Sequence, residues 1–426
     1  MIIKISGKKL SNKTDRTVIL DRKNKSKIYL HNPNSLLPTC RTRLINNQST
    51  NNHINELLNN NKQTADFSEE HDEVLKSIRV SKIILPILIG VVVVLYLLWQ
   101  QFDMEAFSKI NWNSHTLFWI AAAIVLLIIR HIAYATRLRI LSGKVFSWKK
   151  CIELIFIWEF SSAVSPTSVG GTAVALFVLA QEKLAAAKTT ALVIYTAILD
   201  TIFFVGTLPI WILLFGPNII RPNLTSWDNL DGWGYVFVGA YILMAAYGTL
   251  FFYGLFINPN QLKRFLIWIT SFRFFKRFQA KAINLGTDII TASKEMRQEK
   301  WYFHVGAFLA TATAWSCRFL LLNCLIIAIV DSTPTDFFTQ TALYARLETM
   351  FIIMAFSPTP GGAGFAEIVF GGFLGDYVPM GISLIIAFMW RGLTYYAYLI
   401  AGVIVVPNWV RNLLNRRKRK KEELLG

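Results

Sequence analysis

Two copies of a short motif, each rich in hydroxyl residues, proline and glycine, interrupt long apolar stretches of the chain. The first copy, 165–171, reads SPTSVGG, and the second, 357–364, reads SPTPGGAG. Proline removes a backbone donor and glycine leaves the helix at little steric cost, so each copy is expected to break a membrane helix. The half-helix that follows each break would point free N–H groups at an anion, and the hydroxyl groups would add donors. The residues expected to bind substrate are Ser165, Pro166, Thr167, Gly170, Gly171, Arg318, Ser357, Pro358, Thr359, Gly361, Gly362, Gly364 and Glu367.

Ionisable side chains inside the apolar stretches form a second set of candidates. Such groups are costly in a membrane unless they are paired or hydrated, so each is a functional candidate by default. Asp200 and Arg391 each follow a motif glycine by thirty residues. They are predicted to form either a structural ion pair between the two halves or part of a gate, together with Glu159 and Glu348. Arg130, by contrast, is expected to extend to lipid head groups at the inner face.

A simpler interpretation of the motifs also stays open. Small residues let helices approach closely, so each break could be a packing kink without a ligand. A phosphate head group at the breaks, with Arg318 or Arg391 as counter-charge, is the functional alternative. The two interpretations make different predictions for a bulky side chain at the motif glycines, which would block backbone donors only if these donors bind an anion.

The apolar stretches that must position these residues indicate an all-α polytopic membrane protein. The chain has 426 residues, of which 54% are hydrophobic, and most of these fall after residue 82. A bilayer requires roughly 20 apolar residues per helix. We expect about six full spans, at 83–99, 117–129, 191–215, 235–257, 303–330 and 382–406. The motif segments 151–181 and 337–375 are predicted to be two broken re-entrant hairpins, because their arms are short.

The distribution of positive charge predicts the topology. The formal net charge is +18, and Lys and Arg collect on the cytoplasmic flanks of membrane spans. This rule places both termini in the cytoplasm of a plasma (inner) membrane protein, the loop 216–233 outside, and the two hairpins on opposite sides. The order span, hairpin, span would then run in opposite directions in 117–215 and 301–406. Inverted repeats of this kind are common in transporters, where Gly/Pro-interrupted helices mark the binding site.

Composition divides the chain into three parts. Residues 1–75 are rich in Asn, Lys and Ser and are expected to be a disordered cytoplasmic tail. The membrane domain is expected at 76–408, with a basic amphipathic segment at 261–300 on the inner surface. The basic stretch 409–426 is expected to be a second cytoplasmic tail.

Motifs for common enzyme classes are missing. The sequence has no Walker lysine motif, HExxH, GxSxG or Rossmann glycine signature, and its six histidines lie in the tail or near span ends. Its four cysteines form no CxxC pair, so neither a metal site nor a disulfide framework is predicted. We therefore expect no catalytic residues, no metal and no cofactor, and the chain is not predicted to be an enzyme.

The second motif and its flanks, FSPTPGGAGFAE at 356–367, resemble the proline-glycine-glycine-x-glycine-x-x-glutamate signature of the lysylphosphatidylglycerol synthase transmembrane family. This is the flippase-like domain of multiple peptide resistance factor. The segment 165–175 is similar to the family's earlier proline and double-glycine motif. Asp200 matches the aspartate of its glutamate-arginine-x-x-aspartate element, whose first two positions are Thr196 and Ala197 here. The resemblance covers about residues 80–408.

The resemblance implies an integral membrane protein that moves phospholipids or lipid-linked sugars between leaflets. The synthase's soluble aminoacyl-transferase domain is not expected, because the chain stops at Gly426. Two classes of function stay open: a lipid flippase or transporter, and a membrane enzyme or accessory subunit acting on a lipid-linked substrate. The expected partners are membrane lipids, especially anionic ones, and no nucleic acid. A separate lipid-modifying transferase and a homo-oligomer are further candidate partners.

Overall fold

The computed structural model of the protein divides the chain into two compact units, Met1–Ile84 and Leu85–Gly426. It describes residues 110–425 except 165–167, 183, 185, 223, 225, 331 and 356–364, together with Ser108 and three short strands. These strands, β1 (Ile2–Ile3), β2 (Thr17–Leu20) and β3 (Ile28–His31), form an antiparallel sheet in that order. The rest of the segment 1–75 and the span expected at 83–99 lie outside the described residues, so the predicted disorder of the tail stays a prediction.

The described part of the second unit is all-α, as predicted for a polytopic membrane protein. In its described part, five helical stretches are long and apolar enough to cross a membrane: Ser114–Leu141, Ala187–Ile219, Gly232–Ile257, Trp301–Ile329 and Ile385–Arg416. They correspond to the five later spans expected from the sequence. The helices are α4 (Ser114–Leu141), α5 (Trp148–Val164), α6 (Ser168–Gln181), α7 (Ala186–Phe215), α8 (Gly232–Phe252), α9 (Pro259–Ser271), α10 (Gln279–Gln298), α11 (Trp301–Ile329), α12 (Phe337–Ala355), α13 (Phe365–Phe373), α14 (Met380–Arg391) and α15 (Ala397–Leu425).

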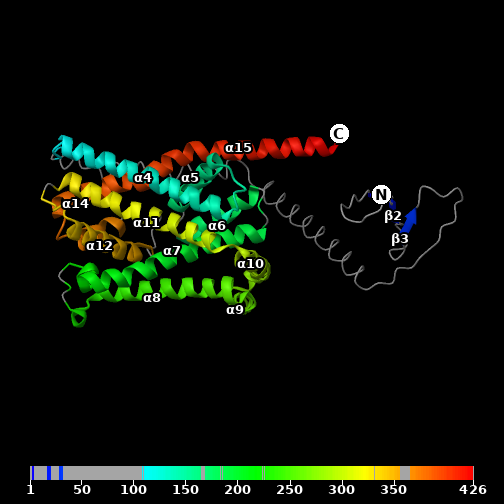
Figure 1. Ribbon diagram of the computed structural model, residues 1–426, viewed down its shortest axis with the longest axis horizontal. Helices are drawn as coiled ribbons and strands as arrows, with labels where there is room; N and C mark the ends of the chain where they lie inside the picture. Colours follow the sequence, from blue (N-terminus) through cyan, green and yellow to red (C-terminus); the bar gives the residue numbers. More distant parts are fainter. Residues whose placement is uncertain are drawn as a thin grey trace. The chain divides into compact units, whose positions relative to one another are not determined.

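The two broken hairpins lie at opposite ends of the bundle (Figure 1). Helices α5 and α6 form the first hairpin, near the end of the bundle where α9, α10 and the C-terminal part of α15 also lie, which we call the basic end. Helices α12 and α13 form the second hairpin, at the opposite end. α4 runs toward the basic end and α7 returns, whereas α11 runs toward the opposite end and α15 returns. This inverted order of span, hairpin and span agrees with the predicted inverted repeats.

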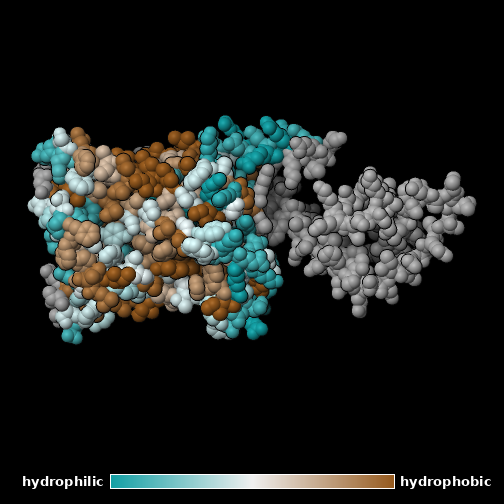
Figure 2. Space-filling view, viewed as in Figure 1, coloured by the Kyte–Doolittle hydropathy of each residue, from teal (hydrophilic) through white to brown (hydrophobic). Residues whose placement is uncertain are grey.

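The central helix of the unit is α11. Two thirds (67%) of its most apolar window is buried inside the protein, against 17% for the span that contains α8. Its most extensive contact is with α4, the first helix of the other repeat. The outer helices instead expose apolar side chains such as Phe118, Leu213 and Leu243. On the face shown in Figure 2, apolar residues gather across the middle of the bundle and hydrophilic residues concentrate at the basic end. This surface is the one that a lipid environment requires.

Helix α7 is continuous but contains a proline, Pro209, in its interior. A proline has no N–H group, so the carbonyl four residues earlier, that of Val205, loses its helical hydrogen bond. The hydroxyl of Tyr241 on α8 donates to this carbonyl at 3.1 Å. A freed backbone carbonyl inside a bilayer needs such a partner, because lipid offers none. The contact between α7 and α8 is therefore specified by a polar group as well as by packing.

The segment between α8 and α11 exposes both aromatic and basic side chains. Helix α9 exposes Phe265 and Trp268. The connection from α9 to α10 exposes Phe274 together with Arg273 and Lys276. Asn258 caps α9 by accepting a hydrogen bond from the backbone N–H of Gln261 at 3.2 Å, and a proline occupies the first turn. Exposed aromatic and basic side chains in one segment are typical of helices that lie at a membrane surface.

Candidate functional site

Arg130, in the middle of α4, is fully buried and forms an ion pair with Glu159 of α5. The distance between Arg130 Nη2 and Glu159 Oε2 is 2.9 Å, and Arg130 Nη1 donates to the Tyr398 hydroxyl at 3.4 Å. The guanidinium also lies over the rings of Tyr134 and Tyr398, 5.2 and 5.3 Å from their centroids. The expectation that Arg130 extends to lipid head groups is wrong. A carboxylate and two aromatic faces compensate its charge inside the bundle, which makes the buried position stable.

Asp200 of α7 forms its ion pair with Arg137, not with Arg391 as expected. The distance between Arg137 Nη1 and Asp200 Oδ1 is 2.5 Å, and the same oxygen accepts a hydrogen bond from Trp315 Nε1 at 2.9 Å. Arg137 Nη1 also donates to the Thr311 hydroxyl at 3.3 Å. The pair therefore joins α4, α7 and α11. Arg130 and Arg137 lie seven residues apart and so share one helix face, a spacing that could have revealed Arg137 in the sequence.

Arg318 of α11 differs from these two arginines, because no described carboxylate pairs with it. Its guanidinium carbon lies 4.6 Å from the centroid of Phe351 and 5.4 Å from that of Trp315. Its Nε atom is buried and has no hydrogen-bond partner among the described residues. Among the described residues, Arg130 and Glu159 interact electrostatically with Arg318, and Glu159 is already bound to Arg130. This cluster of two guanidinium groups and one carboxylate carries an excess positive charge.

Glu348, on α12, has no basic partner among the described residues. It is fully buried, and Trp211 Nε1 of α7 donates to its Oε2 at 2.9 Å. Its other oxygen contacts the hydroxyl of Thr207, one turn before Trp211. The acidic residues that precede the two breaks therefore differ: Glu159 is bound to an arginine, and Glu348 to a hydroxyl and an indole.

Arg391 ends α14 and is also buried, 5% exposed. Its guanidinium carbon lies 4.1 Å from the ring centroid of Tyr395. The five-residue π-turn Gly392–Tyr396 follows directly and connects α14 to α15. A π-turn inside a helical span often marks a functional position.

The motif residues themselves lie largely outside the described part of the chain. This holds for Ser165, Pro166, Thr167, Ser357, Pro358, Thr359, Gly361, Gly362 and Gly364. Gly170 and Gly171 lie in the first turn of α6, and Glu367 lies in the first turn of α13. Their places agree with the predicted half-helices, whose N-terminal turns carry free N–H groups.

An acidic residue follows each hairpin, and each is tied to basic residues at its own end of the bundle. Glu182, after α6, contacts Lys150 of α5 at 2.6 Å and Arg416 of α15 at 3.2 Å, and Trp409 Nε1 donates to it at 2.6 Å. Burial alone would raise the pKa of Glu182, but these hydrogen bonds outweigh it and lower the pKa. At the opposite end, Asp376 pairs with Arg346. The sequence analysis missed both contacts.

The arrangement of two inverted units around a buried cationic cluster can be compared with known proteins. The profile of the family described as lysylphosphatidylglycerol synthase TM region matches residues 83–402. The chain belongs to this family. It is also 21% identical over 287 residues to a UPF0104 membrane protein of Archaeoglobus fulgidus, an alignment that covers 64% of this chain and 81% of that protein. No solved structure matches the chain.

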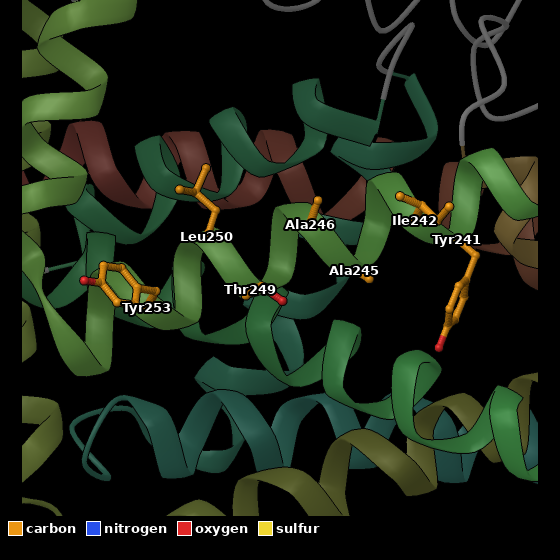
Figure 3. A pocket seen from close by; sticks show the side chains of 7 residues that line it. All are labelled: Tyr241, Ile242, Ala245, Ala246, Thr249, Leu250 and Tyr253. Atoms are coloured by element: carbon orange, nitrogen blue, oxygen red, sulfur yellow. The ribbon is translucent and has the colours of Figure 1, made fainter.

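Beside this family core, α8 presents an open groove to the membrane. Figure 3 shows the side chains that line it, which all belong to one face of α8 and its end: Tyr241, Ile242, Ala245, Ala246, Thr249, Leu250 and Tyr253. The groove has a volume of about 590 Å³ and an apolar lining. Because it lies on the least buried span, it is suited to contact with lipid chains rather than with a polar ligand.

Proposed function

We propose that this membrane protein moves lipids with an anionic head group from one leaflet to the other, as a flippase. The observation that carries the proposal is Arg318, in the middle of a central helix, which has a buried Nε atom without a hydrogen-bond partner and no described carboxylate partner. A charge in this position is costly unless a ligand or water compensates it. A phosphodiester would compensate it and would accept hydrogen bonds from the guanidinium.

The surroundings of Arg318 support a head group rather than a small soluble anion. Two aromatic rings, Trp315 and Phe351, flank its guanidinium, and the outer surface of the bundle is apolar. The half-helices that begin at Ser168 and Phe365 are the returning arms of hairpins at opposite ends of the bundle, and the positive dipole ends at their starts favour negative charge. A head group could thus meet positive partners from both ends, while its acyl chains stay in the lipid.

Orientation follows from the positive-inside rule. We assign the basic end to the cytoplasm, because α9, α10 and the C-terminal residues of α15 carry exposed lysines and arginines there. The hairpin α5–α6 then opens toward the cytoplasm and α12–α13 toward the outside of a plasma membrane. Anionic lipids of the cytoplasmic leaflet would be attracted to the same end.

The test is translocation of a fluorescent phosphatidylglycerol in proteoliposomes, read as loss of accessible label from one leaflet. Arg318→Gln should weaken head-group binding by about 1.5–3 kcal/mol, roughly 10- to 150-fold, whereas Arg318→Lys should retain part of the activity. Arg411→Gln, which removes an exposed arginine of α15, is the matched control and should behave as wild type. Folded wild type that moves no anionic lipid faster than empty liposomes would contradict the proposal. It would favour the alternative, an accessory subunit for a separate lipid-modifying transferase.

A further inference from the structure

The carboxyl group of Glu348 is bound by two groups of α7, neither of which is charged. Oε2 accepts from the indole of Trp211 at 2.9 Å, and Oε1 contacts the hydroxyl of Thr207. Glu348 is 0% exposed, so water does not compensate a charge on it. An ionised carboxylate would be unpaired in the interior of a membrane protein, which is strongly unfavourable.

The Thr207 hydroxyl lies close to two oxygens at once. It has one proton to donate and two lone pairs that accept. Thr207 Oγ1 lies 2.7 Å from the backbone oxygen of Phe203, which can only accept, and it also contacts Glu348 Oε1. The single hydroxyl proton can serve only one of these two contacts, and a proton on Glu348 Oε1 would satisfy the other. In this arrangement a neutral Glu348 donates to Thr207 and accepts from Trp211, and every hydrogen bond is satisfied.

The other titratable groups around Glu348 do not offer a counter-charge. Tyr241 of α8 and Tyr344 of α12 itself lie near Glu348, and neither carries a positive charge. The Tyr241 hydroxyl donates to the backbone oxygen of Val205, and the Tyr344 hydroxyl shares a hydrogen bond with Ser316. Arg318 of α11 lies over Phe351, one turn along α12, and forms no ion pair with Glu348. Arg346, two residues before Glu348, is bound to Asp376 and to the backbone oxygen of Asn218. The short helix after α7, Gly216–Ile219, has no titratable side chain, and the side chain of Glu367 on α13 lies outside the described part.

We propose that Glu348 is a proton-binding site that couples lipid movement to a proton gradient. The inference rests on the proposed function for the lipid part, but the protonation of Glu348 does not. Both glutamates lie on the first arm of a hairpin, Glu159 six residues before the first motif and Glu348 nine residues before the second. Glu159 is ionised and stabilises the fold through its ion pair with Arg130. Glu348 has no such partner among the described residues, so it can gain and lose a proton.

Loss of the proton would release the second hairpin. The O–H bond of Glu348 breaks, the proton passes to water at the end of the bundle opposite the basic end, and the carboxylate keeps the electron pair. Glu348 lies eleven residues into α12, about 16 Å from its exposed start, so water must enter along α12 for this transfer. The remaining charge is unpaired beside α7, and separation of α12 from Thr207 and Trp211 hydrates it. The hairpin is therefore closed when protonated and opens as the proton leaves.

Infrared spectroscopy of the purified protein tests the protonation without any transport assay. The difference spectrum of wild type minus Glu348→Gln should contain the carbonyl stretch of a protonated carboxylic acid at neutral pH. Glu159→Gln is the matched control and should lack this band, because Glu159 is ionised by Arg130. The absence of the band in the Glu348 spectrum would overturn the inference, whatever the protein transports.

Proteoliposomes with an imposed proton gradient test the coupling. Wild type should translocate labelled phosphatidylglycerol at a rate that depends on the gradient, by up to about tenfold per pH unit for one titrating site. Glu348→Gln keeps a donor toward Thr207 and an acceptor toward Trp211, so it should fold and melt as wild type does but lose the dependence. A gradient response of Glu348→Gln equal to that of wild type would overturn the coupling. Gradient-independent transport by wild type would also overturn it and leave the flippase proposal intact, whereas no transport at all would count against that proposal alone.

Discussion

The ion pair of Arg130 with Glu159 lies between α4 and α5 and should contribute to the stability of the fold. Removing one partner of a buried pair leaves the other charge unpaired, which costs about 3–5 kcal/mol. We therefore expect Glu159→Gln to lower the unfolding temperature strongly, because Arg130 is fully buried and has no second carboxylate among the described residues. Thermal unfolding in detergent, followed by tryptophan fluorescence, measures this. Glu295→Gln, on the exposed face of α10, is the control. Equal melting of Glu159→Gln and wild type would show that the pair is not stabilising.

The same argument applies to Asp200 with its observed partner. Asp200→Asn should destabilise the protein, because Arg137 is buried and loses its carboxylate. The exchange Arg137→Asp with Asp200→Arg should recover part of the loss, whereas Asp200→Arg with Arg391→Asp should recover none. Melting temperatures of the two double variants compare the observed pair with the pair expected from sequence. Rescue by the second double variant alone would contradict the observed contact.

At this scale the sequence identified residues but not their partners. Hydropathy was sufficient to single out Asp200, Glu159, Glu348 and Arg318, since an ionisable group in an apolar run stands out. Pairing depends on which helix faces meet, and sequence spacing in one repeat does not determine that. Arg130 was misinterpreted because its distance from the span end was considered without Glu159, which lies 29 positions away in the chain.

Pro209 leaves one carbonyl of α7 without its helical hydrogen bond, so the link between α7 and α8 through the Tyr241 hydroxyl can be tested. Tyr241→Phe should cost about 1–3 kcal/mol, because it leaves the buried carbonyl of Val205 without a donor. In a Pro209→Ala background, the new N–H group restores the helical bond to Val205, so Tyr241→Phe should cost clearly less. A double-mutant cycle of unfolding free energies measures the coupling. Additive effects of the two substitutions would exclude the proposed link.

Glu182 ties the first hairpin to α15 through Lys150, Arg416 and Trp409, and this contact should respond to acid. Its pKa is lower in the folded protein than the value of about 4.3 for a free glutamate. A carboxylate with a lowered pKa stabilises the fold above its unfolded pKa, and this contribution disappears as the pH falls through the folded pKa. Wild type should thus lose stability as the pH falls below about 4.

The variant Glu182→Gln separates this effect from general acid denaturation. It should melt at a lower temperature than wild type at neutral pH, and the difference should shrink on acidification. Glu153→Gln is the control, because Glu153 contacts the same lysine at 3.1 Å but leaves the Glu182 cluster in place. If the melting temperatures of Glu182→Gln and wild type differed by the same amount at every pH, the ionised Glu182 would not be the source of the pH-dependent stability.

The helical elements were largely predictable. Long apolar runs give the spans, and Pro/Gly motifs give the ends of α5 and α12, since both features act through local backbone chemistry. The π-turn after Arg391 and the contact between Tyr241 and α7 were not predictable in the same way. They depend on packing between helices that are distant in sequence.

For the whole molecule, the inverted order of the two units places one hairpin at each end, and each is closed by its own ion pair. Lys150–Glu182 lies at the basic end and Arg346–Asp376 at the opposite end. Between them lie Arg318 and the pair of Arg130 with Glu159. In a transporter of this form, one end opens while the other stays closed around a site near the midplane. In such a cycle, the ion pair at one end would break while the ion pair at the other end stays formed. The neutral form of Glu348 would favour closure of the end opposite the basic end.

The proposed direction of these movements depends on which end faces the cytoplasm, and labelling of single cysteines determines this. Thr335→Cys and Trp227→Cys lie in exposed loops at the end opposite the basic end, and Gln298→Cys lies at the basic end. The native Cys151, Cys317 and Cys324 are buried, and Cys40 is replaced by Ser in the test protein. A membrane-impermeant maleimide added to intact cells should label the first two variants and not Gln298→Cys, which should react after the cells are opened. Labelling of Gln298→Cys in intact cells would reverse the assignment. The proton from Glu348 would then leave toward the cytoplasm, and an inward gradient could not drive the cycle in the proposed direction.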